Sequence, residues 1–477
     1  MKRHVGFLKI LLAAASAGSA VGACTVGPDY KPPELAPPPE FRGQQPSADD
    51  ISLADVPWQE MFKDAQLQAL IEEGLRNSPD LAIAAARIEQ ARALVGVASS
   101  EGLPQIGYEA GGGAEKTFVP EPDAIGTTKF AAVRGLLTSA WELDLWGRIK
   151  RTTEAARANL GVQEQFLRAV HLTLVSDIAS GYFNLLRLDR ELAIAEDSNQ
   201  AYRKILDLFS TRFEAGRDSK LPVERTQAAY DSSSGRMADL KRQIEQQENA
   251  LSVLTGAYPR AVTRGVPLTA QSLPAMPPGL TTDLLRRRPD IRQAEQVMIR
   301  ANAEVGVAVA NFYPRIGLAA LLGGIAVDGE NGIGGSFGFW SLGAKLAGPI
   351  FTGGRLESIY NQRKAFWDES VAQYRKTVLT AFQETSNALA AQQNLVGYRA
   401  ALERQVGALR RSVELAVTRY DSGRSSYFEV LEAQQQLFPA EDELARVQQA
   451  QLLAVVSLYK ALGGGWGPAE TDGARPS

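Results

Sequence analysis

The residue types that most often perform chemistry are rare in this chain of 477 residues. It has two histidines, His4 and His171, and a single cysteine, Cys24, which leaves few ligands for zinc or haem. His171 lies near Ser176 and Asp177, which suggests a hydrolase triad. Residues six positions apart do not face each other on a helix, however, and no nucleophile-elbow motif is present. We therefore predict no catalytic site, no metal site and no cofactor.

The N-terminus contains the one residue for which we predict a chemical modification. Basic residues precede an apolar run, and small residues then lead into Cys24, which is the pattern of a secretory signal peptide. A signal that ends at a lone cysteine resembles a bacterial lipoprotein signal, and Thr25 after it favours the outer membrane. We predict a signal peptide over 1–23, then a lipid anchor and proline-rich spacer over 24–57. The alternative is an ordinary signal peptide with an accidental cysteine.

Charge and hydropathy narrow the class further. The net charge of −3 gives no indication of a nucleic-acid partner. Beyond the N-terminus, no apolar run reaches the roughly 18 residues that a membrane-spanning helix needs.

A repeated motif organises the rest of the chain. Arg-Phe-Glu-Ala-Gly-Arg at 212–217 returns as Arg-Tyr-Asp-Ser-Gly-Arg at 419–424, 207 positions later (419 − 212). In both copies a long helical pattern ends, a glycine permits positive φ, and a second helix follows. The spacing predicts two long helical hairpins with tips at about 216–220 and 422–426. Along the second long helix, apolar residues at 402, 406, 409, 413, 416 and 420 lie four and three positions apart, which is the coiled-coil period. The same contact line, or seam, falls at 195, 199, 202, 206, 209 and 213 in the first.

A second similarity extends each repeat towards the N-terminus. Pro79-Asp80 matches Pro289-Asp290 at an offset of 210 (289 − 79), and the match continues for about 30 residues. After it, the period of each copy changes from helical to strand-like. We predict a first repeat over 58–257, a linker over 258–280, a second repeat over 281–463 and a disordered tail over 464–477. An amphipathic helix is expected over 58–76.

Each repeat is predicted to contain one β-hairpin, at about 104–147 and 314–352, with glycine-rich loops over 111–129 and 328–335. Aromatic residues gather near the expected strand ends: Tyr108, Trp141, Trp146, Tyr313, Trp340 and Phe351. They fit either the core of an ordinary antiparallel sheet or the girdle of a membrane barrel. Secretion, lipidation and strands of roughly 10 residues favour the barrel.

Four strands are too few for a barrel, since the smallest stable barrels have about 8. Several chains must therefore contribute strands, and a trimer would supply 12. The predicted fold class is an α+β membrane protein, trimeric, with two structural repeats per chain, a barrel of long α-helical hairpins and a transmembrane β-barrel.

Five motifs resemble one known family. They are Cys-Thr-Val-Gly-Pro-Asp-Tyr-Lys-Pro-Pro at 24–33, Asp-Leu-Trp-Gly-Arg at 144–148, Gly-Pro-Ile-Phe-Thr-Gly-Gly-Arg at 348–355, Arg-Tyr-Asp-Ser-Gly at 419–423 and Val-Leu-Glu-Ala-Gln at 430–434. Together they resemble the outer-membrane efflux lipoproteins of tripartite resistance-nodulation-division pumps, the NodT-type branch of the TolC superfamily. The resemblance implies a lipid-anchored homotrimer in the outer membrane that extends into the periplasm. It also implies passive export of small molecules, no enzymatic activity, and a periplasmic adaptor and an inner-membrane pump as partners.

The resemblance also assigns roles at the tips. Residues of both turns would contact the adaptor: Gly216, Arg217, Asp218, Ser219, Ser422, Gly423, Arg424 and Ser425. Family channels narrow there with rings of carboxylates, and Glu429 and Glu432 lie at the matching positions, where relatives often have aspartate. Threefold symmetry would also let Arg419, Asp421 and Arg424 hold neighbouring tips together by ion pairs. The alternative is that the charges at this entrance are solvated helix-end charges with no gating role. Pro222 stands where some relatives have an aspartate that latches the closed state.

Two other functions compete with an efflux duct. A periplasmic coiled-coil scaffold or adaptor lipoprotein would share the anchor and the helices, but an adaptor has one hairpin and a lipoyl-like β-domain. A TolC-like duct for type I secretion would share the whole architecture. The sequence does not indicate the cargo.

Overall fold

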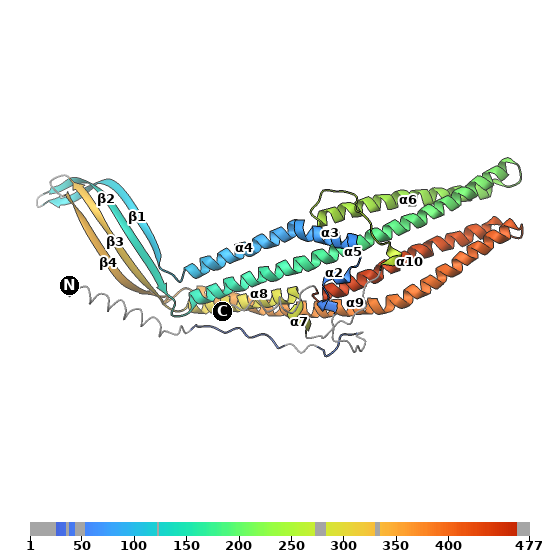
Figure 1. The fold of residues 1–477 in the computed structure, drawn as a ribbon. Coiled ribbons are helices and arrows are strands. Elements are labelled where there is room, and N and C mark those ends of the chain that lie inside the picture. Colours follow the sequence, from blue (N-terminus) through green and yellow to red (C-terminus); the bar gives the residue numbers. More distant parts are fainter. Residues whose placement is uncertain are drawn as a thin grey trace. The chain divides into compact units, whose positions relative to one another are not determined.

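The structure is a computed structural model that describes residues 25–34, 38–42, 53–121, 124–271, 283–329 and 334–464 (Figure 1). The predicted signal peptide, Cys24 and all but the first residue of the predicted tail lie outside this range. The chain divides into two compact units. We call them the strand unit (1–34, 86–164 and 293–375) and the hairpin unit (35–85, 165–292 and 376–477).

The strand unit contains one antiparallel sheet with the order β1-β2-β3-β4 (Figure 1). Its strands are β1 (Gln105–Glu121), β2 (Ala124–Leu143), β3 (Arg315–Gly329) and β4 (Gly334–Ala347). The registers place Gln105 opposite Ala140, Phe130 opposite Gly329, and Arg315 opposite Ala347. Strand β2 of the first repeat therefore pairs with β3 of the second, while β1 and β4 are the edges of the sheet.

The strands are longer than predicted, and the predicted loop over 111–129 is wrong. The β1–β2 ladder continues until Glu121 lies opposite Ala124, and Gly111 to Gly113 pair with residues 132–134. Glycine lacks a side chain but keeps the backbone donor and acceptor that a ladder uses, so a glycine run does not by itself end a strand. The second loop is also shorter than expected, because β3 extends to Gly329 and β4 begins at Gly334.

Each repeat contributes one long hairpin. Helices α5 (Arg148–Glu214) and α9 (Arg355–Asp421) both have 67 residues, and the return helices α6 (Lys220–Leu254) and α10 (Tyr427–Ala461) both have 35. The shorter helices are α2 (Trp58–Met61), α3 (Ala65–Asn77), α4 (Pro79–Ser100), α7 (Asp283–Arg287) and α8 (Pro289–Ala310), with 3₁₀ turns η1 (Leu53–Asp55) and η2 (Leu268–Ala270). In the described ranges, none of the helices has both the length and the apolarity needed to cross a membrane.

The two hairpin turns have the same hydrogen-bond pattern. The amide of Arg217 donates to the carbonyl of Arg212, and that of Arg424 donates to the carbonyl of Arg419, both at 2.9 Å. Gly216 and Gly423 lie inside these loops with φ of 66° and 67°. This is the Schellman ending, in which a residue of positive φ satisfies the last helical carbonyls. The repeated motif therefore fixes the same turn twice.

The core of the hairpin unit surrounds the middle of α5. Its fully buried large side chains include Tyr182, Phe183, Leu185 and Leu188 of α5, with Tyr459 of α10 packed in the same cluster. The return helices end beside this cluster at Gly256 and Gly463, both at φ 71°. Around the middle of α5, the helices therefore pack through a broad apolar core and not only through a heptad seam.

Asp64 joins the start of the first repeat to the segment between the repeats. The helix expected over 58–76 is interrupted, because α2 ends at Met61 and Asp64 caps α3 through the amides of Gln66 and Leu67. The buried carboxylate also accepts hydrogen bonds from Tyr182 Oη (3.0 Å), the Val266 amide (2.9 Å) and Gln271 Nε2 (2.7 Å). The described part of the 258–280 segment is thus attached to the hairpin unit.

We expect Asp64→Ala to destabilise the hairpin unit by about 2–4 kcal/mol, because it removes a helix cap and leaves buried donors without an acceptor. Thermal unfolding of the purified protein measures the effect. Asp197→Ala, at an exposed position of α5, is the matched control and should leave the midpoint nearly unchanged. Equal midpoints for the two variants would contradict the role given to Asp64.

Candidate functional site

The eight residues predicted to contact an adaptor lie at the two turns. Gly216, Arg217 and Ser219 are exposed, as are Ser422, Gly423 and Arg424, while Asp218 and Ser425 are half-buried. Both turns are hydrogen-bonded Schellman endings that present polar side chains at the surface.

The two tips contact each other within one chain. A cavity of about 320 Å³ lies between them, lined by residues of both hairpins that include Pro222, Arg225, Ser425 and Phe428. Tyr427 packs edge-on against Phe209 and Tyr420, with ring centroids 5.0 and 4.9 Å apart. Pro222 therefore lies in the contact between the tips, where it contributes an apolar surface.

Arg212 connects the two tips. Its guanidinium lies 5.4 Å from the ring centroid of Tyr420, and its Nη1 is 3.9 Å from the Asp218 carboxylate. Cation–π contacts of this kind contribute about 0.5–1 kcal/mol at exposed sites. Sequence reasoning did not single out Arg212 or Tyr420 for this role. The available signal was the basic–aromatic pair that both copies of the motif carry.

At the predicted entrance, Arg419 has a partner within its own chain. Its Nε lies 3.6 Å from Oε2 of Glu429, and both side chains are about half exposed. Asp421, Arg424 and Glu432 are exposed and form no ion pair with another described residue. An exposed pair contributes about 0–1 kcal/mol, so it leaves Arg419 able to exchange partners.

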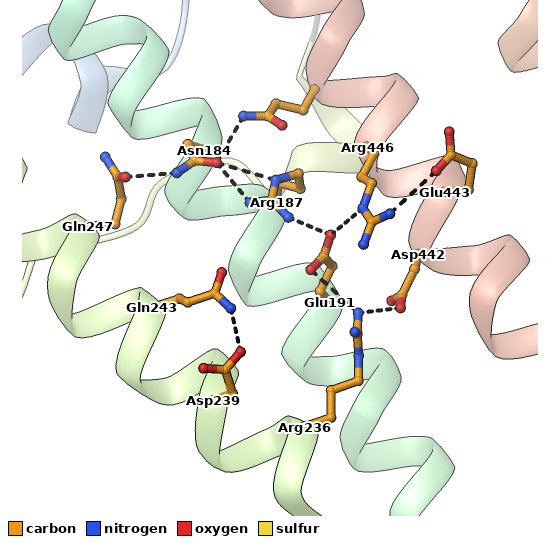
Figure 2. A network of polar contacts seen from close by, with 11 residues as sticks. Asn184, Arg187, Glu191, Arg236, Asp239, Gln243, Gln247, Asp442, Glu443 and Arg446 are labelled. Carbon is orange, nitrogen blue, oxygen red and sulfur yellow. Dashed lines mark hydrogen bonds and ion pairs between the residues drawn. The ribbon is translucent and has the colours of Figure 1, made fainter. Parts of the chain in front are cut away.

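A partly buried network of ion pairs joins the two hairpins (Figure 2). Glu191 of α5, with a side chain only 4% exposed, contacts Arg187 of its own helix, Arg236 of α6 at 3.6 Å and Arg446 of α10 at 3.3 Å. Arg236 also forms an ion pair with Asp442 of α10. We call Arg187, Glu191, Arg236, Asp442 and Arg446 the hairpin network.

Burial raises the pKa of Asp442 to about 6, and the nearby charge of Arg236 acts in the opposite direction. The members of the network lie up to 259 positions apart (446 − 187), and no local motif marks them. Sequence reasoning therefore missed this network entirely.

The residues of the rejected triad have structural partners. Ser176 Oγ donates to the carbonyl of Leu172 at 2.8 Å, and Asp177 lies 3.7 Å from Nζ of Lys460 in α10. His171, Ser176 and Asp177 are all on α5. In the described part of the chain, no group of three histidine, cysteine, aspartate or glutamate residues is arranged to hold a metal ion.

The segment after Cys24 is held against the strand unit. The amide of Val26 donates to the carbonyl of Trp146 at 3.1 Å, and Asn302 Nδ2 donates to the carbonyl of Pro28 at 2.9 Å. Asp29 forms an ion pair with Arg151 at 2.6 Å. These contacts place the start of the spacer at the junction between β2 and α5.

The motif at 144–148 builds that junction. Asp144 caps α5 by accepting from the amides of Ile149 and Lys150, and Trp146 Nε1 donates to the carbonyl of Pro314 at 2.7 Å. Gly147 has φ 74°, and a Cβ there would lie 2.6 Å from Thr25 Cγ2. The conformation and the contact with Thr25 both require glycine at this position.

The pleat of the sheet separates charged from apolar residues. Because side chains alternate and the registers are known, one face carries Glu109, Glu115, Arg134, Glu142, Arg315 and Lys345. The ion pair between Glu109 and Arg134 lies on this charged face. The opposite, apolar face carries exposed large side chains that include Ile106, Tyr108, Val133, Leu137, Trp141, Leu322, Trp340, Leu342 and Leu346.

The apolar face carries no charge over 9–11 residues of each strand. Its residues within 106–114, 131–141, 316–326 and 336–346 include no charged one, and Lys116, Lys129 and Asp328 follow towards the hairpin ends. Membrane-spanning strands need about 9–11 residues. Tyr108, Trp141 and Trp340 lie on this face, whereas Trp146 stacks on Tyr313 at the junction, with centroids 4.7 Å apart.

A repeated unit of long helical hairpin and β-hairpin, with a charge-free band on one face of the sheet, is the architecture of outer-membrane channels. The family model described as "Outer membrane efflux protein" matches residues 70–257 and 280–464. The chain belongs to this family.

Relatives and solved structures agree with this assignment. The chain is 32% identical to the cation efflux system protein CusC of Escherichia coli over 456 residues, 94% of this chain and 97% of that protein. It is 34% identical to the solvent efflux pump outer membrane protein SrpC of Pseudomonas putida, with coverage of 94% and 96%. The solved outer-membrane channel OprN superposes with a TM-score of 0.83 at 29% identity, covering 93% of this chain and all of that one.

These findings confirm three of the predictions. The family resemblance was correct, the fold class is that of the TolC-type outer-membrane channels, and the chain is the outer-membrane channel of an efflux system.

Proposed function

We propose that three copies of this chain form one passive duct through which small molecules leave the periplasm. The observation that carries this proposal is the four-stranded sheet with two open edges and a charge-free apolar face. Lipid tolerates no unpaired edge, and four strands are too few to close a barrel. In a trimer, β1 of one subunit pairs with β4 of the next, the apolar face meets lipid and the charged face lines the pore.

Planar-bilayer recording together with a mass measurement in detergent tests this proposal. A trimer that conducts ions fits the duct. A protein that is trimeric or monomeric but never conducts fits the scaffold reading instead. Secretion of a large folded polypeptide through the conducting protein would favour the type I duct over the efflux duct.

The two faces of β4 give a matched pair of variants. Leu342 lies on the apolar face and its neighbour Ser341 on the charged face. We expect Leu342→Arg to prevent insertion, because arginine near the bilayer midplane costs about 2–4 kcal/mol per subunit. Ser341→Arg should insert and change only conductance. Heat-modifiable trimers in outer-membrane fractions report insertion, and equal yields of the two variants would argue against this assignment of the faces.

We also propose that Cys24 is acylated and becomes the mature N-terminus. The contacts of Val26, Pro28 and Asp29 support this, because they hold residues shortly after Cys24 at the strand-to-helix junction, where the apolar face begins. An acyl chain attached directly before these residues would reach the inner leaflet without an extended spacer.

Intact-mass measurement of the membrane form should give a chain that begins at Cys24 and carries acyl groups. Cys24→Ser should lack the added mass. An unmodified cysteine in the wild-type protein, or a mature chain that begins elsewhere, would refute the modification.

The partners proposed from the family are a periplasmic adaptor at the tips and an inner-membrane pump. The largely exposed turns at 216–219 and 422–425 support adaptor contact, because their backbone hydrogen bonds are already formed without a partner. The printed names of the two relatives concern cations in one case and solvents in the other. The cargo of this chain is therefore proposed only as small molecules.

For the entrance we propose rings of Glu429 and Glu432 from three chains. Replacing both by glutamine should lower the preference for cations and weaken block by polyvalent cations, because the ring charge is lost. Glu414→Gln, at an exposed position of α9, is the control. Replacing Asp421 and Arg424 should instead raise the resting conductance. Reversal potentials and conductances equal to those of the control would place the throat elsewhere.

A further inference from the structure

Helix α10 contains a proline close to the hairpin network. Pro439 lies inside the helix, three positions before Asp442 and seven before Arg446. Proline has no amide hydrogen and crowds the preceding turn, so the helix loses a hydrogen bond there and bends easily. The tip part of α10, which carries Glu429 and Glu432, lies on one side of this position. The network residues Asp442 and Arg446 lie on the other.

A cavity of about 430 Å³ adjoins the proline. It is lined by Ser198 and Tyr202 of α5, Ser233 of α6, and Phe438 and Pro439 of α10, with Arg236 and Asp442 among its other lining residues. Close-packed interiors hinder movement, whereas a lined cavity leaves room for it. Pro439 therefore borders a space in which α10 can change its position against the first hairpin.

The hairpin network joins the two hairpins at this place. Arg236 of α6 pairs with Asp442 of α10, and Arg446 of α10 contacts Glu191 of α5 at 3.3 Å (Figure 2). The first of these two contacts depends on the carboxylate of Asp442.

Asp442 is poorly satisfied as a carboxylate. Oδ2 accepts from Arg236, while Oδ1 is buried and has no hydrogen-bond partner among the described residues. The charged groups around it are Glu191 from α5, Arg236 from α6, and Arg446 and Glu441 from α10 itself. Glu441 is paired in turn with Arg410 of α9. Burial and the two like charges disfavour ionisation, and the two arginines only partly offset them.

The stability of the docked conformation depends on pH because Asp442 binds its proton more tightly there than when it is hydrated. In the docked conformation the pKa of Asp442 is raised to about 6 from 3.8, so this conformation binds the proton more tightly than one in which Asp442 is hydrated. The stabilisation of the docked form is therefore fully present below about pH 4. It is lost as the pH rises to about 6.

We propose that Asp442 makes the docking of α10 on the first hairpin proton-dependent. The neutral carboxyl group keeps α10 against α5 and α6, and the ionised carboxylate favours a hydrated arrangement in which α10 moves at Pro439. Acid conditions then hold the tip part of α10 in place, and neutral conditions release it. The consequence for gating rests on the proposed function, because it takes Glu429 and Glu432 to line the entrance.

Distance measurement between spin labels tests the proposal in the intact protein. Spin labels at Ala228→Cys on α6 and Gln436→Cys on α10, both exposed positions, report the distance between these two helices. Labelled subunits are diluted into unlabelled ones so that only distances within one chain are measured. The protein with Cys24 as its single cysteine gives the background signal. We expect the ratio of long to short distances to rise between pH 4 and 6, by up to about 100-fold. Asp442→Asn should keep the short distance at every pH, and Arg236→Gln should extend the rise to higher pH.

Asp239→Asn is the matched control, because among the described residues Asp239 accepts hydrogen bonds from Arg242 and Gln243 of its own helix. It should titrate like the wild type. A wild-type distance that does not change between pH 4 and 7, or an Asp442→Asn variant that titrates like the control, would overturn the proposal. If Asp442→Asn does not fold, the wild-type titration and the Arg236→Gln shift still decide it. Bilayer recordings on the same preparations separate the proposed duct from the proton-dependent docking. A protein that conducts ions but whose label distances do not change with pH would refute the docking proposal and leave the duct intact.

Discussion

The unpaired edges of the sheet constrain everything else in this molecule. Strands β1 and β4 each present a row of backbone donors and acceptors that the described chain does not satisfy, and a bilayer offers no water to satisfy them. A single chain could not place its apolar face in lipid without leaving these groups unpaired. Association is therefore a condition of insertion, and the twofold repeat within the chain allows a few copies to supply enough strands.

In both repeats the return helix ends in the same kind of contact, but the tips of the two hairpins differ. Gly256 packs against Asn77, and Gly463 packs against Arg287 and Arg288, so each return helix ends on the residues that precede the proline of its own repeat. At the tips, by contrast, the first copy has Pro222 and the second has Glu429 at the start of the return helix. Because their helices have equal lengths, the two hairpins can lie side by side along their whole length. Because the residues at their tips differ, each hairpin presents a different surface there.

The sequence allowed prediction of features that depend on local patterns. The glycine turns at 216 and 423 and both long helices were predictable, because periodicity and capping act over a few residues. The full strand length was not, because the glycine-rich stretch at 111–113 looks like a loop until its partner strand is known. Asp64 and Glu191 were also missed. Their partners lie on other elements, and nothing in the neighbouring residues indicates which distant side chain will complete a buried hydrogen bond or ion pair.

These polar contacts explain how two long hairpins keep one register. A heptad seam alone permits neighbouring helices to slip by a repeat, since each apolar position resembles the next, and a polar residue in the seam removes that freedom at some cost in stability. Asn199 is such a residue: its amide bonds to Ser233 and Ser234 of α6 at 2.9 and 2.7 Å. Glu191 plays the same part between the hairpins, because a slipped α10 would leave its buried carboxylate without Arg446. Register therefore depends on polar groups that tolerate only one alignment, while the apolar seam supplies most of the burial.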